Sequence, residues 1–212
     1  MARILVINPN SSQACGRGIE DAVSSFPGIE VVNLPDGPPA IYSWRDWHLA
    51  AEQICRRIEA DEARDPPDAY VIACASDPGI EAARALTARP VFGVLRCAVA
   101  AAVARAERFG IIAIVDASRA RHMAALRAMG LESRLAGSVA LNVTMDTLLD
   151  ANAARTRLIA AAKELGSMGA QTIILGCTGM AHHRPAIEHA CGLPVIDPCQ
   201  AGAALAVGAV VG

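Results

Sequence analysis

The sequence has few aromatic side chains and a single lysine, Lys163. Phe, Trp and Tyr together make up 3% of the 212 residues, whereas apolar residues as a whole make up 53%. The core must therefore be built from Ala, Val, Ile and Leu, which suits helices that approach a sheet closely. So large an apolar share provides material for a core and excludes disorder as the dominant state.

Motifs for common cofactors and metals are also missing. The sequence contains no Gly-x-Gly-x-x-Gly, no P-loop and no Cys-x-x-Cys, and Lys163 lies in an expected amphipathic helix rather than in a setting typical of pyridoxal phosphate. The seven cysteines are an odd number, which argues against a disulfide framework. The three histidines between residues 182 and 189 match no common zinc-ligand spacing. We therefore predict neither a cofactor nor a metal.

Neither sign of charge is in large excess, because the sequence has 19 Lys and Arg and 21 Asp and Glu, for a formal net charge of −2. Without a basic stripe, a nucleic-acid partner is not expected. No apolar run reaches the roughly 18 residues of a membrane span, and the N-terminus lacks the pattern of a secretory signal. We predict a cytoplasmic protein that binds a small-molecule substrate and neither nucleic acid nor membrane.

Short apolar runs alternate with longer segments of helical periodicity. Strands are expected at residues 3–7, 30–34, 70–73, 90–94, 109–115, 138–141, 172–175 and 194–196. Helices are expected from Ser11 or Ser12 to about 25 and at 44–63, 98–108, 119–129, 151–168, 185–190 and 201–210. Because the strands are apolar throughout rather than at alternate positions, they indicate an α/β fold with parallel sheets covered on both faces.

The pattern starts again in the second half of the chain. The strand that ends at Asn8 has a counterpart ending at Asp116, and the strand before Cys74 has one before Cys177. We predict two pseudo-symmetric lobes, each a parallel sheet flanked by helices. Open parallel sheets bind ligands at the C-terminal ends of their strands, which places the active site in the cleft between the lobes. Residues 1–95 and 196–212 are assigned to lobe 1, and residues 96–195 to lobe 2.

Cys74 and Cys177 each follow an apolar strand and precede a turn of small and hydroxylated residues. Backbone N–H groups and a helix dipole after each turn are expected to lower the thiol pKa from about 8.5 toward neutrality. A thiolate and a thiol on opposite sides of a cleft can remove a proton from one face of a carbon and return one to the other. The sequence thus predicts inversion at a carbon, with two packed core thiols as the structural alternative.

Four motifs occur in an order that resembles one known family. They are residues 8–12 (NPNSS), Cys74 with residues 77–79 (DPG), residues 176–180 (GCTGM) and residues 195–198 (VIDP). Together they are similar to the aspartate/glutamate/hydantoin racemase superfamily, and within it to the hydantoin and allantoin racemase branch. The resemblance spans nearly the whole chain and includes residues 37–41 (GPPAI). It implies a cofactor-independent racemase, a homo-oligomer, with Cys74 and Cys177 as acid and base.

Gly179, which follows Gly-Cys-Thr, bears on the substrate. In the family that the sequence resembles, glutamate racemases have His at this position and aspartate racemases have Glu. A glycine instead leaves room and a free backbone N–H for a neutral planar ring. Removal of the C5 proton of a hydantoin gives an enolate that amide donors stabilise. We predict a racemase of 5-substituted hydantoins or allantoin. The alternatives are an amino-acid racemase, a dicarboxylate isomerase or decarboxylase of the superfamily, and a non-catalytic binding protein; Cys74 argues against the decarboxylase.

Further substrate-binding residues are expected near the strand ends. They are Asn8, Ser12, Ile41, Ser76, Asp77, Arg96, Asp116, Thr178 and Gly179. Asn8 and Ser12 can hydrogen-bond a ring amide or cap a helix, and Asp77 can cap the helix that follows it. Ser76 and Thr178 directly follow the cysteine positions and can donate to an enolate oxygen.

Arg96 and Asp116 depart from the resemblance, because hydantoin racemases typically have Glu and Thr at these two positions. Arg96 either binds a substrate carboxylate or pairs with Asp116 to support the cleft wall. The aromatic cluster of Tyr42, Trp44 and Trp47 is interpreted as packing or a subunit contact, with a mobile lid as the alternative.

Overall fold

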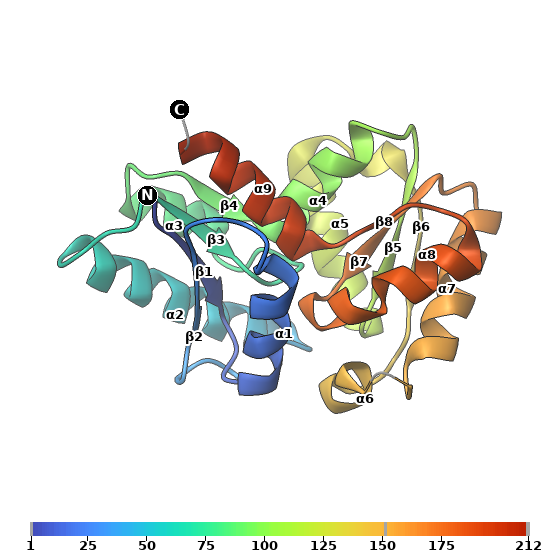
Figure 1. Cartoon of the computed structure of the whole chain (residues 1–212), viewed down its shortest axis with the longest axis horizontal. Helices are drawn as coiled ribbons and strands as arrows, with labels where there is room; N and C mark the ends of the chain where they lie inside the picture. The colour runs from blue at the N-terminus through green and yellow to red at the C-terminus, as the bar shows by residue number, and fades with distance from the viewer. Residues whose placement is uncertain (1, 151, 211–212) are drawn as a thin grey trace.

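The computed structural model describes residues 2–150 and 152–210, and it contains two four-stranded parallel sheets that lie side by side (Figure 1). The strands are β1 (Ile4–Asn8), β2 (Ile29–Asn33), β3 (Ala69–Ile72), β4 (Val91–Gly93), β5 (Phe109–Ala113), β6 (Leu135–Ala140), β7 (Thr172–Gly176) and β8 (Val195–Ile196). Their order is β2-β1-β3-β4 in one sheet and β6-β5-β7-β8 in the other, with parallel pairing throughout. The two sheets thus repeat one topology, as predicted.

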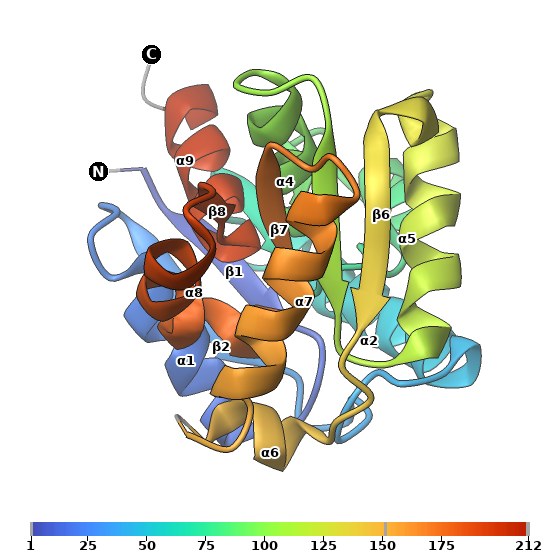
Figure 2. The ribbon, with the colours of Figure 1, turned by 90° about the vertical axis from the view of Figure 1, so that its right-hand side faces the viewer.

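Helices flank both sheets. They are α1 (Gln13–Val23), α2 (Trp44–Glu62), α3 (Ile80–Leu86), α4 (Val94–Val103), α5 (Asp116–Met129), α6 (Met145–Leu149), α7 (Arg155–Ser167), α8 (Arg184–Cys191) and α9 (Pro198–Val210), with 3-10 turns η1 (Glu132–Arg134) and η2 (Thr178–His183). Figure 2 shows the second sheet with α7 before it and α5 behind it. Among the described residues, no helix has both the length and the apolar character needed to cross a bilayer.

The central strands are buried on both faces, which explains their continuous apolar sequences. In β1, Ile4 and Val6 pack toward α1 and α9, whereas Leu5 and Ile7 pack toward α2 and α3. Burial of each such side chain stabilises the fold by about 1.5–3 kcal/mol. The predicted α/β architecture with covered parallel sheets is confirmed.

Two helices connect the sheets. α4 follows β4 of the first sheet directly but packs Leu95 and Val99 against β5 of the second. α9 follows β8 of the second sheet but packs Ala203 against the first. The two helices contact each other at Gly202, where an added Cβ would lie 3.0 Å from side-chain atoms of Val71 and Val94. The lobe boundaries at residues 95 and 196 stay a prediction.

The structure corrects several predicted helices. α4 begins at Val94 rather than at 98, because a carboxylate outside the helix satisfies the first free N–H groups (see below). The short elements α3, α6 and η2 were not predicted, since five to seven residues carry too little periodicity to detect. Residues 1, 151, 211 and 212, which the predicted lobes and the helix at 151–168 include, lie outside the described residues.

Candidate functional site

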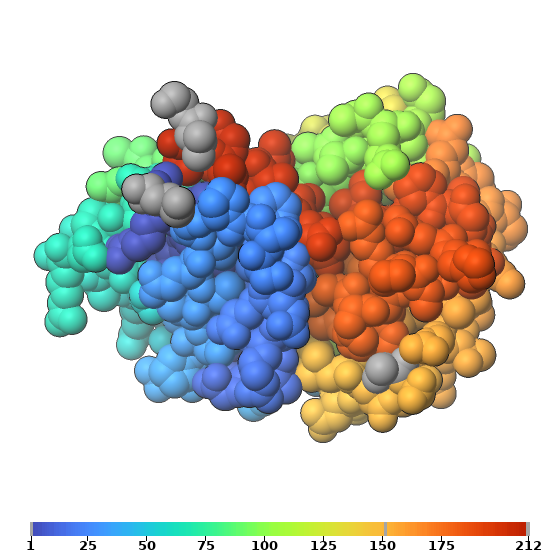
Figure 3. Space-filling view, in the orientation of Figure 1, coloured from blue at the N-terminus to red at the C-terminus, as the bar shows by residue number. Residues whose placement is uncertain are grey.

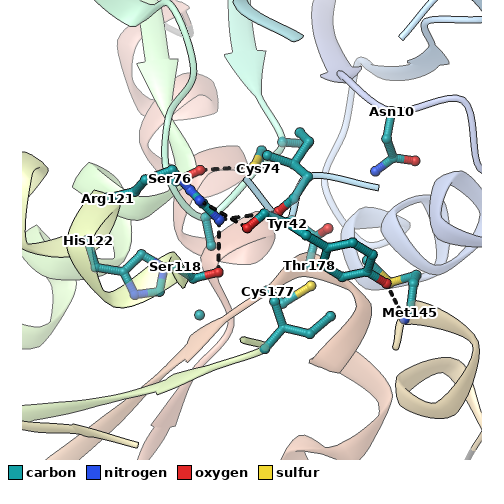
Figure 4. Close-up of a pocket in the computed structure, with 15 residues that line it drawn as sticks. Asn10, Tyr42, Cys74, Ser76, Ser118, Arg121, His122, Met145, Cys177 and Thr178 are labelled. Carbon is teal, nitrogen blue, oxygen red and sulfur yellow. Dashed lines mark hydrogen bonds between the residues drawn. The ribbon is translucent and has the colours of Figure 1, made fainter. Parts of the chain in front are cut away.

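Cys74 and Cys177 line one cavity of about 40 Å³ between the two sheets. Cys74 lies two residues beyond β3 and Cys177 directly follows β7, so each sits at the C-terminal end of a central strand. Figure 4 shows both side chains at this cavity, together with Tyr42 and Arg121. All seven cysteines are free thiols. The fold thus brings together the two residues predicted to be acid and base.

The Cys74 sulfur lies beside a hydroxyl and a cation. Its Sγ is 3.3 Å from the Oγ of Ser76, and the Arg121 guanidinium lines the same cavity. Burial raises the pKa of Cys74 to about 11, although the hydrogen bonds with Ser76 and the charge of Arg121 act in the opposite direction. Cys74 is therefore protonated at neutral pH in this structure.

Cys177 has a more apolar environment and is 8% exposed. Burial raises its pKa above the ordinary thiol value; the nearby sulfurs of Cys15 and Cys74 act in the same direction, and a backbone hydrogen bond from Gly179 opposes them. The predicted lowering of both thiol pKa values is wrong. Cys177 precedes a 3-10 turn rather than a long α-helix, and Cys74 is separated from α3 by a loop, so neither sulfur caps a strong helix dipole.

The first turns of α5 supply two buried basic side chains to the cavity, Arg121 and His122. Arg121 Nη2 donates to the Ser118 Oγ at 2.9 Å, and the guanidinium also donates to the carbonyl oxygens of Ile41 and Tyr42, each at 3.3 Å. Burial, with the charge of Arg121, lowers the pKa of His122 to about 4, so this imidazole is neutral at pH 7. Arg121 is thus the charged group of the described cavity wall.

The segment before α2 lines the cavity with Ile41 and Tyr42, and the first turn of α2 supports it. Met145 N donates to the Tyr42 hydroxyl at 2.6 Å, and the Trp47 Nε1 donates to the Ser76 carbonyl at 3.1 Å. Trp44 packs edge-on against Trp47, with ring centroids 5.7 Å apart, and is 44% exposed. Two of the three aromatic residues therefore support the cavity itself, which the sequence interpretation as packing or a subunit contact did not specify.

Of the predicted site residues, Cys74, Cys177, Ile41, Ser76 and Thr178 line the cavity. The others lie outside its wall.

Asn8 and Ser12 hold the loop after β1 in place. The buried Asn8 amide donates to the Asn33 Oδ1 at 2.7 Å, and the Ser12 hydroxyl caps α1 by accepting from Cys15 N at 3.2 Å. Ser12 therefore has the capping role that was its alternative, whereas Asn8 connects the end of β1 to the end of β2. Asn10, from the same motif, lines the cavity instead.

Asp77 is buried beneath the start of α4 rather than in the cavity. Its carboxylate accepts from Leu95 N at 2.9 Å and from Arg96 N at 3.0 Å, which caps α4 and not the following α3. The backbone of Asp77 is left-handed, with φ of 47°. A Cβ on Gly93 would lie 2.3 Å from this carboxylate, so the glycine makes room for the cap.

The predicted ion pair between Arg96 and Asp116 is wrong. Arg96 lies in the first turn of α4 and pairs with Asp77 at 3.2 Å and with Glu81 at 2.5 Å. Asp116 is exposed at the start of α5 and pairs with Arg119 at 2.9 Å. The early start of α4 explains the difference, because it turns Arg96 toward the loop after β3.

Gly179 is not among the residues that line the cavity. A Cβ on it would lie 3.1 Å from the Met145 Sδ, and the residue borders a separate hollow of about 460 Å³ between α1 and η2. Figure 3 shows the seam at which α1 meets the second half of the chain. Its backbone N–H, however, is the group that opposes the raised pKa of Cys177. Gly179 therefore acts on the site through its backbone.

Nothing in the described part of the chain gathers three or more His, Cys, Asp and Glu side chains in a way that could hold a metal ion.

Comparison with known proteins places the chain in a family. Residues 4–206 match the Asp/Glu/hydantoin racemase family. The chain belongs to this family. A hydantoin racemase from Paenarthrobacter aurescens is 39% identical over 210 residues, which cover 96% of this chain and 89% of the relative. An allantoin racemase from Klebsiella pneumoniae is 31% identical with a TM-score of 0.89, covering 100% of this chain and 88% of that one. The protein is therefore an isomerase, a racemase of this superfamily.

A glutamate racemase from Francisella tularensis shares the fold, with a TM-score of 0.72 at 18% identity over 99% of this chain and 81% of that one.

The cavity that holds the two cysteines also has lining residues that were not among the predicted site residues. They are Asn10, Tyr42, Ser118, Arg121, His122 and Met145, together with the small or apolar Ala73, Ala75, Ile114 and Gly176. A signal for Arg121 was present, because α5 follows the end of β5 and its first turns must lie near the same cleft. The helix was predicted to begin at 119, and one arginine among several gives no indication of which faces the cleft.

Proposed function

We propose that this racemase acts on hydantoin-like substrates, 5-substituted hydantoins or allantoin, by proton transfer between Cys74 and Cys177. One observation carries the proposal: two cysteines from the corresponding strand ends of two lobes line a single cavity. A planar ring between two sulfurs would present one face of its acidic carbon to each.

The reaction needs one sulfur as thiolate and the other as thiol. The thiolate takes the proton from C5, and the electrons of the C–H bond move into the adjacent carbonyl to form an enolate. The opposite thiol then gives its proton to the other face of C5, which leaves the enantiomer and a thiolate on the second sulfur. The Ser76 hydroxyl and the Thr178 hydroxyl, both at the cavity, are candidate donors to the ring oxygens.

The character of the cavity supports a neutral ring rather than an amino acid. No Asp, Glu or Lys belongs to its wall among the described residues, and Arg96 lies outside it. An amino-acid racemase was expected to bind the substrate carboxylate through Arg96, which does not reach the cavity. The hydantoin and allantoin racemase relatives at 39% and 31% identity also favour the ring substrate.

A substrate panel tests the proposal. Enantiopure 5-substituted hydantoins, both allantoin enantiomers, aspartate and glutamate are incubated with the protein in D2O, and optical rotation and the α-proton NMR signal are followed. We expect loss of rotation together with deuterium incorporation for the hydantoins or allantoin. Racemisation of the amino acids alone would contradict the proposed substrate class, and binding without exchange would favour the non-catalytic alternative.

We further propose a cytoplasmic homo-oligomer. The family resemblance supports assembly. Sedimentation equilibrium at several concentrations would show a monomer if the proposal is wrong.

A further inference from the structure

Arg121 is a buried cation at the cavity and has no carboxylate partner. Its residue is 3% exposed, and the described part of the chain places no Asp or Glu oxygen within 4.0 Å of its guanidinium. Trp44 lies over the guanidinium, with the ring centroid 6.0 Å from Cζ. Buried arginines are ordinarily paired, because an isolated buried charge is costly. The described residues therefore do not neutralise this cation, and a bound substrate or an ionised thiol can do so.

The guanidinium is held in place but not fully used. Of its five N–H donors, three bond the Ser118 hydroxyl and the carbonyls of Ile41 and Tyr42. The buried Nε has no acceptor among the described residues. Arg121 is thus oriented by neutral acceptors and retains donors for a further oxygen.

A count of charges in the cavity wall indicates what that oxygen is. With both thiols protonated and His122 neutral, Arg121 gives the wall one positive charge. Asp46 acts on Arg121 from a distance, but its carboxylate accepts from Ser43 N at 2.9 Å and caps α2. The proposed reaction carries one negative charge, first on a sulfur, then on the enolate oxygen. A neutral ring together with one thiolate brings the net charge of the cavity to zero, whereas a dicarboxylate together with a thiolate would bring it to −2.

We propose that Arg121 is a catalytic residue that pairs with the single negative charge of the reaction, stabilising the Cys74 thiolate and then the enolate oxygen of a neutral ring substrate. This inference rests on the proposed function and deepens it. The guanidinium keeps all its protons: the C5 proton goes to Cys74, the C–H electrons go to the carbonyl oxygen beside Arg121, and the Cys177 proton goes to C5. In the opposite direction the same enolate forms with the sulfur roles exchanged.

Two other roles predict different behaviour. Arg121 also joins α5 of the second lobe to the segment at Ile41 and Tyr42 of the first, so a purely structural role would affect stability and not the chemical step. A role in binding a substrate carboxylate would affect KM for acidic substrates and leave neutral ones unchanged.

The test uses Arg121→Gln, Arg121→Lys and Arg119→Gln with a neutral 5-alkyl hydantoin. Arg119 lies on the same helix, is exposed and pairs with Asp116, so its variant is the matched control for loss of one positive charge. We expect Arg121→Gln to lower kcat about 10²–10³-fold, the loss typical of a missing oxyanion donor, with KM changed less than about threefold. Arg121→Lys should fall between, and Arg119→Gln should resemble the wild type.

A second variant keeps the proposal testable if Arg121→Gln unfolds. Arg121→Ala leaves a space in which added guanidinium ion can bind, and millimolar guanidinium should restore part of kcat without restoring KM. Retention of wild-type kcat by a folded Arg121→Gln, a rise in KM alone, or a folded Arg121→Ala that guanidinium does not rescue would each overturn the role. Absence of hydantoin and allantoin racemisation by the wild type would instead refute the proposed function, so the two failures are distinguishable.

Discussion

The ends of β3 and β7 carry the same residue in corresponding places of two similar sheets, yet the two sulfurs have different surroundings. Cys74 has a hydroxyl at 3.3 Å and the charge of Arg121, and its pKa is about 11. Cys177 has two neighbouring sulfurs, which raise its pKa further, and one backbone donor, which lowers it. The raising effect of burial is therefore opposed less at Cys177 than at Cys74. Pseudo-symmetry of the fold therefore does not give symmetry of chemistry, and Cys74 is the sulfur that ionises more readily.

The turns after the two cysteines also differ in what holds them. Charge holds the first, through the Asp77 carboxylate, the N-terminus of α4 and Arg96. The turn after Cys177 is held by the buried Met180 and by a hydrogen bond of 2.9 Å between the His183 Nε2 and the Leu148 carbonyl. The two edges of the cavity should thus respond differently to loss of one charge.

The largest effect is expected from Asp77→Ala. The change removes the buried acceptor of the Leu95 and Arg96 N–H groups and of the Arg96 Nη1, and leaves Arg96 only its exposed partner Glu81, which should cost about 3–5 kcal/mol of unfolding free energy. Urea denaturation measures it. Glu81→Gln is the matched control, because it removes the exposed partner of the same arginine and should cost less than about 1 kcal/mol. Equal losses in the two variants would show that the cap is not what holds the first turn.

The next effect concerns His122 and pH. Its pKa is about 4 in the folded protein and about 6.5 when unfolded, so the unfolded state binds the proton first as pH falls. His122 therefore contributes stability that is present above pH 6.5 and is lost between pH 6.5 and 4, by at most about 3 kcal/mol. Asp77, with a pKa of about 6, titrates in the same window with the opposite sign.

Comparison with a variant isolates the His122 contribution. In His122→Gln, the loss of unfolding free energy between pH 7 and pH 4.5 should be smaller than in the wild type, while the contribution of Asp77 is common to both. An identical pH dependence in the two proteins would mean that His122 is not buried in its neutral form.

A smaller effect separates the two sulfurs directly. Iodoacetamide should alkylate Cys74 at least about tenfold faster than Cys177, because only the thiolate reacts and Cys74 has the lower pKa. The rate at Cys74 should rise about tenfold per pH unit from pH 7 to 9. Peptide mass spectrometry after timed quenching gives both rates. Faster modification of Cys177, or a rate that levels off below pH 9, would reverse the comparison.

The smallest effect is expected at Gly179, on the Cys177 side. An alanine there meets the flexible end of the Met145 side chain and keeps the backbone N–H, so it should cost less than about 1.5 kcal/mol. Because Gly179 lies outside the cavity, kcat/KM for a hydantoin should stay within about threefold of the wild type. A large loss of activity at unchanged stability would show that Gly179 contacts substrate, as the sequence first indicated.

The sequence contained enough information for the fold and for the cysteine pair, and less for the rest of the site. Continuous apolar strands determine parallel, covered sheets, and parallel strands place Cys74 and Cys177 at corresponding edges. Which face of α5 turns to the cleft depends on packing, so Arg121 and His122 could not be separated from exposed neighbours such as Arg119. The position of Arg96 depended on where α4 begins, and that start is set by Asp77, which lies 18 and 19 residues before the two N–H groups that it caps.

In the proposed reaction each sulfur serves one face of the substrate, and deuterium exchange by Cys74→Ser and Cys177→Ser tests this directly. Each purified variant is incubated with each enantiomer of a substrate hydantoin in D2O, and rotation and α-proton signal are followed together. Serine is too weak an acid or base near neutral pH to replace either thiol. We predict that both variants lose racemisation, that each retains slow exchange for one enantiomer only, and that the two prefer opposite enantiomers. Retained racemisation in either variant would contradict the assignment of Cys74 and Cys177 as paired acid and base.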